Sequence, residues 1–151
     1  NLEKVFSNIR NSIYVHIKRE PVYNMQSLLL AREKYFNDKT IWWSVKPMEY
    51  EKLKGMDIYH QIAGQVYYTN KAIGKALGSI PKKNKTIIQY EEFCKDPEKY
   101  YRELREKYKA HGYIFPEKYE GVLSFNNSNK IKLSKDEIKK FEKAYQFFEK
   151  E

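Results

Sequence analysis

Cysteine is almost absent from this chain, because Cys94 is the only one in 151 residues. A single cysteine excludes an internal disulfide framework and a zinc site built from several cysteines. No apolar run approaches the roughly 20 residues that a helix needs to cross a bilayer, and the first ten residues contain neither the apolar core of a signal peptide nor an initiator Met. We therefore expect no transmembrane segment in this chain. The cytoplasm is the default compartment, with a Golgi or membrane-anchored parent protein as the alternative.

The composition nevertheless predicts a folded protein. Hydrophobic residues make up 41% and aromatic residues 16%, too much apolar surface for a disordered chain, and the length fits one domain over residues 1–151. The net charge of +9, from 29 Lys and Arg against 20 Asp and Glu, favours an anionic partner such as a nucleotide, nucleic acid, acidic polysaccharide or membrane surface. Many lysines stand beside glutamates in helical segments, however, which is typical of an ordinary solvated surface.

Hydrophobic periodicity and capping residues predict the order of the elements. The β-branched runs at Ser12–Lys18 and Lys85–Tyr90 predict two buried strands. The predicted helices are Pro21 to about Phe36, Met48 to about Lys54, a helix capped by Asp57 that ends near Leu77, a helix from Asp96-Pro97 to Gly112, and a final helix opened by the Ser134/Glu137 capping box. Residues 113–132 are predicted to be irregular, and residues 2–9 to be a helix end or an irregular lead-in.

A strand that leads directly into a helix occurs twice, which predicts an α/β protein with a parallel sheet. Two strands are too few for such a sheet, because parallel sheets are covered on both faces and usually contain more strands. We therefore expect the sheet to be incomplete, with its missing strands before Asn1.

Arg19 stands where chemistry is expected in an α/β sheet. Ligands gather at the carboxyl ends of parallel strands, and anions gather at the N-termini of helices. Arginine there offers a rigid fork of donors to a phosphate, and Ser27, in the second turn of the following helix, would add a hydroxyl. Surface ion pairing of Arg19 with Glu20 is the simpler alternative.

Two stretches in this order resemble the PAPS-dependent sulfotransferases. IYVHIKREPVYNMQSLLLAR, with its strand, Arg, acidic residue, Pro and a Ser eight residues after the Arg, looks like the motif that binds the 3′-phosphate of the nucleotide in that family. KTIIQYEEFCKDPEKYYRELREKYKAHGY resembles the later strand and its Asp-Pro-capped helix. The resemblance covers most of residues 12–112.

The resemblance implies a fold, a cofactor and a site. The fold would be a P-loop-like three-layer sandwich, and the chain would transfer a sulfuryl group from 3′-phosphoadenosine 5′-phosphosulfate to a hydroxyl or amine, leaving adenosine 3′,5′-bisphosphate, without a metal. Acceptors could be a carbohydrate, a lipid, a protein or a small alcohol. The residues that the resemblance suggests for binding the nucleotide are Arg19, Ser27, Tyr90, Asn127 and Lys130.

The sequence also departs from the family pattern. Val22, Tyr23 and Gln89 replace an arginine, an acidic residue and a second arginine, and nothing resembles the 5′-phosphosulfate loop. No GxxxxGK[ST] phosphate loop occurs. We therefore expect the C-terminal, cofactor-binding part of such an enzyme. Whether this fragment is active by itself stays open, and we assign no catalytic base. His16 is expected to be packed in its strand. A basic nucleic-acid- or polyanion-binding module and a fragment of a nucleotide kinase are the alternatives, although the resemblance leads us to expect no nucleic acid partner.

Overall fold

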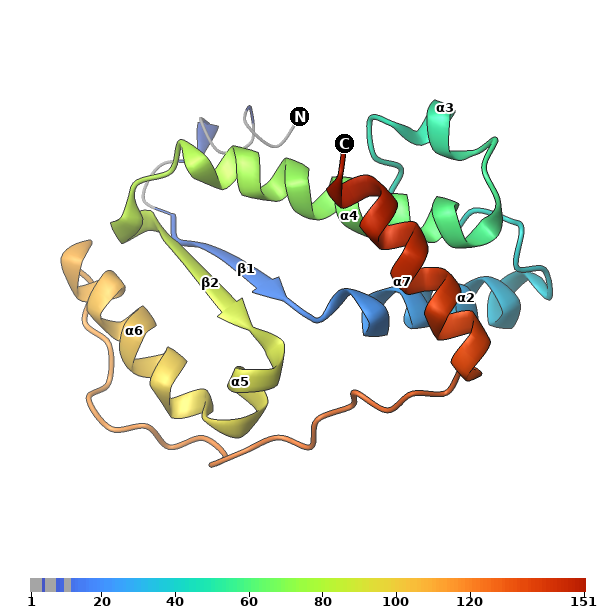
Figure 1. Cartoon of the computed structure of the whole chain (residues 1–151). Coiled ribbons are helices and arrows are strands. Elements are labelled where there is room, and N and C mark those ends of the chain that lie inside the picture. Colours follow the sequence, from blue (N-terminus) through green and yellow to red (C-terminus); the bar gives the residue numbers. More distant parts are fainter. Residues whose placement is uncertain (1–3, 5–7, 10–11) are drawn as a thin grey trace. The chain divides into compact units, whose positions relative to one another are not determined.

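The computed structural model describes residue 4, residues 8–9 and residues 12–151. They form two compact units, each described here by itself. Unit 1 contains the described residues up to Arg19 together with Ile73–Ser128, and unit 2 contains Glu20–Ala72 and Asn129–Glu151. Figure 1 shows the elements, which are β1 (Tyr14–Lys18), α2 (Pro21–Phe36), α3 (Tyr50–Leu53), α4 (Ile58–Gly78), η1 (Lys82–Asn84), β2 (Lys85–Gln89), α5 (Tyr90–Lys95), α6 (Pro97–Ala110) and α7 (Lys135–Glu149).

The described part of the chain is therefore mixed α/β and mostly helical, with one two-stranded sheet. β1 and β2 pair in parallel, as predicted, and their register sets Tyr14 opposite Lys85 and Lys18 opposite Gln89. The prediction of two βα units, in each of which a strand leads into a helix, is thus confirmed for both strands and for the helices that follow them. That residues 1–151 make one domain stays a prediction.

The prediction that both strands are buried is wrong. Val15, Ile17 and Ile87 are 46%, 60% and 48% exposed. The reason is that the sheet has only these two strands among the described residues, so helices cover it only in part. Thr86 illustrates the covered part, since its buried hydroxyl donates to the Oε1 of Glu103 on α6 at 2.9 Å.

Strand β2 ends one residue earlier than predicted, and a short helix that the sequence did not predict, α5, follows it directly. Tyr90 opens α5 instead of closing the strand, and Glu91 and Glu92 lie in the first turn of that helix. Carboxylates at the N-terminal turn are favoured by the helix dipole, which is why this acidic pair suits a helix start.

The capping residues predicted at both ends of α6 are confirmed. Asp96 accepts a hydrogen bond from the backbone N–H of Lys99 at the start of α6, and Pro97 occupies the first turn. Gly112, with φ of 80°, ends the helix in the left-handed conformation that glycine adopts without strain. The backbone N–H of Tyr113 then bonds the carbonyl of Tyr108 at 3.0 Å, which satisfies a free carbonyl of the last turn.

Unit 2 is a helical cluster with its own apolar core. Phe141 and Phe148 of α7 are wholly buried against residues of α2, α3 and α4, and α7 opens with both halves of the predicted capping box. Its core is completed by Met25, Leu29, Leu53, Ile62, Ala63, Val66, Tyr68 and Ala144.

Residues 113–132 contain no helix or strand, as predicted, and the expectation for residues 2–9 falls mostly outside the described residues. Within the described part of the chain, no helix is both long enough and apolar enough to span a membrane.

Candidate functional site

Arg19 and Tyr90 lie side by side at the carboxyl ends of the two parallel strands. Each follows the last residue of its strand, and those last residues, Lys18 and Gln89, face each other in the register. The guanidinium carbon of Arg19 stands 5.2 Å from the centroid of the Tyr90 ring. This cation–π contact holds the guanidinium over the aromatic face, so the sheet itself brings together two of the predicted binding residues.

Ser128 completes this arrangement from the irregular segment. Its Oγ lies 2.8 Å from the phenolic oxygen of Tyr90 and accepts from Nη2 of Arg19 at 3.4 Å. The backbone N–H of Ser128 also donates to the Tyr90 oxygen at 3.3 Å. These three residues, all in unit 1, are called here the Arg19–Tyr90–Ser128 cluster.

The irregular segment reaches the cluster because it is anchored to α5. The backbone N–H of Phe125 donates to the carbonyl of Cys94 at 2.8 Å, and its ring stacks on Phe93 with centroids 5.4 Å apart. Three residues later the chain arrives at Ser128. The sequence alone does not show which residue of the polar stretch 126–130 meets Tyr90. The anchor at Phe125 decides that it is Ser128.

The cluster combines groups that suit an anion. It offers the guanidinium N–H groups, two hydroxyls and one backbone N–H, with Arg19 and Tyr90 half-buried and Ser128 exposed. A planar guanidinium can donate two parallel hydrogen bonds to one phosphate. The Arg19 to Ser128 bond is long for a hydrogen bond, so an anion that accepts from Arg19 gives up little by displacing it.

Ser27 lies in unit 2, so its predicted partnership with Arg19 stays a prediction. It is exposed on α2, and its hydroxyl donates to the carbonyl of Tyr23, four residues earlier, at 2.8 Å. Ser and Thr in helices commonly make this bond. Binding of a phosphate by Ser27 would therefore require its hydroxyl proton to turn away from that carbonyl.

Asn127 and Lys130 are both exposed. Asn127 precedes Ser128 in unit 1. In unit 2, the backbone of the segment around Lys130 is held by the buried Gln26, whose Nε2 donates to the Lys130 carbonyl at 2.8 Å and whose Oε1 accepts from the Lys132 N–H at 2.6 Å. Gln26 therefore fixes the backbone here, a role that no motif signalled.

We assign no catalytic base among the histidines that the structure describes. His16 is buried in β1, as expected, with 8% of its surface exposed. His60 pairs with Asp57, with Nδ1 and Oδ2 2.5 Å apart. Burial raises the pKa of Asp57, but hydrogen bonds from the backbone and ring of His60 outweigh it and hold this pKa below its usual value. This pair caps α4.

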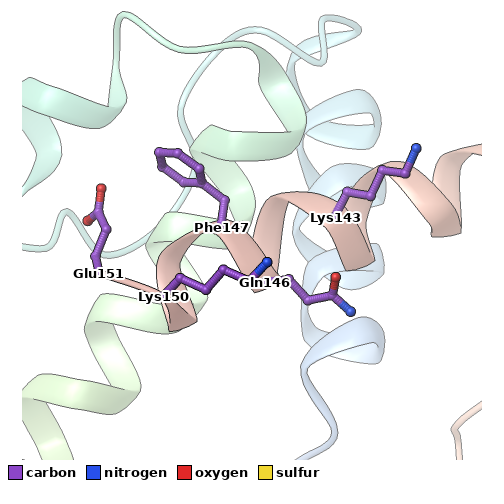
Figure 2. A pocket seen from close by; sticks show the side chains of 5 residues that line it. All are labelled: Lys143, Gln146, Phe147, Lys150 and Glu151. Atoms are coloured by element: carbon purple, nitrogen blue, oxygen red, sulfur yellow. The ribbon is translucent and has the colours of Figure 1, made fainter.

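A shallow hollow of about 470 Å³ lies along the last turns of α7. Figure 2 shows its lining side chains, Lys143, Gln146, Phe147, Lys150 and Glu151, projecting from this one segment. Glu151 is already engaged, because it binds Lys52 at 2.7 Å and Tyr68 at 2.5 Å. Side chains from a single helix end do not converge on a ligand, so this hollow does not constitute a site.

A second hollow, of about 260 Å³, lies wholly in unit 2 and includes Ser27 in its lining. No group of three or more His, Cys, Asp or Glu side chains that could hold a metal ion occurs within the described residues. No family model, curated protein or solved structure matches this chain.

Proposed function

We propose that this chain is the cofactor-binding part of a sulfotransferase that uses 3′-phosphoadenosine 5′-phosphosulfate. The observation that carries the proposal is the Arg19–Tyr90–Ser128 cluster at the carboxyl ends of two parallel strands. This is the edge of an α/β sheet where ligands gather, and its donors suit the 3′-phosphate of the nucleotide.

The cluster gives Arg19 its role in this proposal. The contact of its guanidinium with the Tyr90 ring restricts the Arg19 side chain before the nucleotide arrives, so less side-chain freedom is lost on binding. Tyr90 and Ser128 add hydroxyls beside it. Asn127 and Lys130, on the same exposed stretch of chain, are proposed to extend over the nucleotide, and Ser27 to contribute once its hydroxyl turns.

The proposal also assigns a fold, a P-loop-like sandwich whose sheet contains further strands. Its support is the apolar surface that β1 and β2 leave uncovered at Val15, Ile17 and Ile87, because strands of a parallel sheet are normally buried on both faces. We propose that the missing strands hold the 5′-phosphosulfate group. When bound, the cofactor supplies the sulfuryl group for in-line transfer to a hydroxyl or amine. The residues described here bind and orient its 3′-phosphate.

The experiment is a calorimetric titration of the chain with adenosine 3′,5′-bisphosphate, adenosine 5′-monophosphate and ATP. We expect preference for the bisphosphate. Arg19→Ala should lower this affinity by about tenfold to a hundredfold, because hydrogen bonds to charged groups contribute roughly 1.5–3 kcal/mol. The matched control is Arg102→Ala, which removes an equal charge from the exposed face of α6 in the same unit and should leave the affinity unchanged.

Three results would contradict the proposal. Equal losses in the Arg19 and Arg102 variants would show that only net charge matters. Equal, strongly salt-dependent binding of all three nucleotides that ignores Arg19→Ala would instead identify a general polyanion-binding protein. Preference for ATP over the bisphosphate would favour the nucleotide kinase alternative.

A further inference from the structure

The hollow in unit 2 is lined by nine residues, none of them charged. They come from α2, from α4 and from the loop at Ser44 and Val45. Its volume of about 260 Å³ falls just below the roughly 300–1,000 Å³ of ligand pockets. The hollow therefore suits one small molecule.

The lining is polar yet neutral. Among the residues that the structure describes, the nine that line the hollow include no Lys, Arg, Asp, Glu or His. This is unusual in a chain of which 32% is charged. Asn24 and Asn70 supply carboxamides from opposite helices, and Ser27, Ser44 and Thr69 supply hydroxyls. Such groups donate to and accept from neutral hydroxyls but offer no counter-charge to a phosphate or a carboxylate.

Part of the surface is apolar. Leu28 of α2, Val66 of α4 and Val45 of the loop also line the hollow. A surface of aliphatic side chains with a few amides and hydroxyls complements a molecule that has C–H faces and a rim of hydroxyls.

Gln65 is the observation that points to an occupant. It lines the hollow and is only 3% exposed, and its Nε2 donates to the carbonyls of Trp43 and Val45, both at 2.8 Å. Two acceptors at Nε2 fix the orientation of the amide, because the oxygen could not bond either carbonyl. Oε1 is then buried without a hydrogen-bond donor within the described part of the chain. A buried acceptor of this kind calls for a donor that the protein does not itself supply.

The loop that Gln65 holds is strained between its two contacts. Ser44 has φ of 71°, in the left-handed region that residues other than glycine seldom adopt. The carbonyls of Trp43 and Val45, on either side of Ser44, are the two that Gln65 binds. One side chain thus keeps this loop in place and carries a buried, unsatisfied acceptor.

We propose that this hollow binds a neutral, hydroxyl-rich small molecule the size of one sugar ring, with one of its hydroxyls donating to Oε1 of Gln65. This hollow shares only Ser27 with the proposed nucleotide-binding residues, and its lining residues include no cation for a phosphate. Ser27 belongs to its lining and, with its proton given to Tyr23, offers an acceptor to the same ligand.

The test is a titration of isotope-labelled chain, followed by the backbone and side-chain amide signals in two-dimensional NMR spectra. The probes are the methyl glycosides of glucose, galactose and mannose, together with myo-inositol. Glucuronate and glucosamine serve as an anionic and a cationic ring of similar size. We expect saturable shifts centred on Gln65, Asn24 and Asn70 with at least one neutral probe, in the millimolar range or tighter, and weaker binding of both charged rings.

Two variants test the lining directly. Thr69→Val replaces a hydroxyl by a methyl of the same shape, and Asn70→Leu removes a carboxamide; each should lower the affinity by about tenfold, the effect of one lost hydrogen bond. Gln146→Leu is the control, because it makes the same amide-to-leucine change on the exposed side of α7, outside this hollow, and should leave the affinity unchanged. Circular dichroism spectra that match the parent chain would establish that the variants are folded.

Three outcomes would overturn the proposal. They are the absence of saturable shifts at Gln65, Asn24 and Asn70 with every neutral probe, tighter binding of glucuronate or glucosamine, and equal affinities in Asn70→Leu and Gln146→Leu. Because no nucleotide is present in this titration, its failure is distinguishable from failure of the nucleotide proposal.

Discussion

Adding one methyl group at Gly64 should destabilise the protein, although alanine favours a helix over glycine. Gly64 lies in α4, where a Cβ would collide with Cδ2 of Leu53 and approach Cζ of Phe148 at 3.0 Å. Leu53 and Phe148 are both wholly buried in the core of unit 2. Neither side chain can move into solvent, so the helix must shift or the core must repack.

Two opposing effects set the size of the change. Gly→Ala in a helix interior stabilises by roughly 0.5–1 kcal/mol, through lower backbone entropy in the unfolded chain. Inserting a methyl into a packed core costs about 1–3 kcal/mol. We therefore expect Gly64→Ala to lower the free energy of unfolding by up to about 2.5 kcal/mol.

Gly74→Ala is the matched control, because Gly74 lies in the same helix and a Cβ there would meet no atom within 4 Å. This variant should gain the roughly 0.5–1 kcal/mol of helix propensity alone. Urea unfolding followed by circular dichroism would give both values. In a Leu53→Ala background the collision with Leu53 is removed, so Gly64→Ala should lose most of its penalty. Equal effects of the Gly64 and Gly74 substitutions, or an unchanged penalty in the Leu53→Ala background, would refute the close packing described here.

Three further predictions concern α7 and the cluster. Ser134→Ala removes the acceptor for the Glu137 backbone N–H and should cost about 0.5–2 kcal/mol in urea unfolding; an effect no larger than that of Ser79→Ala, a serine outside any N-cap, would contradict the capping role. The backbone N–H and then the hydroxyl of Ser134 lower the pKa of Glu137, so its contribution to stability is fully present above the ordinary value of 4.5 and is lost as the pH falls through the lower folded pKa. Glu137→Gln should therefore show a shallower loss of stability in acid than the parent chain, and parallel curves would disprove this. Tyr90→Phe removes the hydroxyl that meets Ser128 but keeps the ring under Arg19, so bisphosphate affinity by calorimetry should fall less than in Arg19→Ala; equal losses would contradict the role assigned to the guanidinium.

Local interactions determined what could be predicted from the sequence. The start of α2 follows from Pro21 at its first position, and the starts of α4, α6 and α7 follow from Asp57, Asp96 and Ser134. Each cap acts within three or four residues, so its signal is complete in a short stretch of chain. The parallel pairing of the strands was predictable for a related reason, since a strand followed by a helix recurs in order.

Residues distant in the sequence decided the rest. Ser128 joins Arg19 and Tyr90 only because Phe125 is anchored on α5, more than thirty residues earlier. The neutral hollow exists because α2, the Ser44 loop and α4 meet around the amide of Gln65. Hydrogen bonds and packing between such segments depend on how the helices are placed, and no periodicity or cap encodes that placement. The sequence by itself therefore determined the elements and Arg19 as a candidate, whereas tertiary packing decided which side chains meet it.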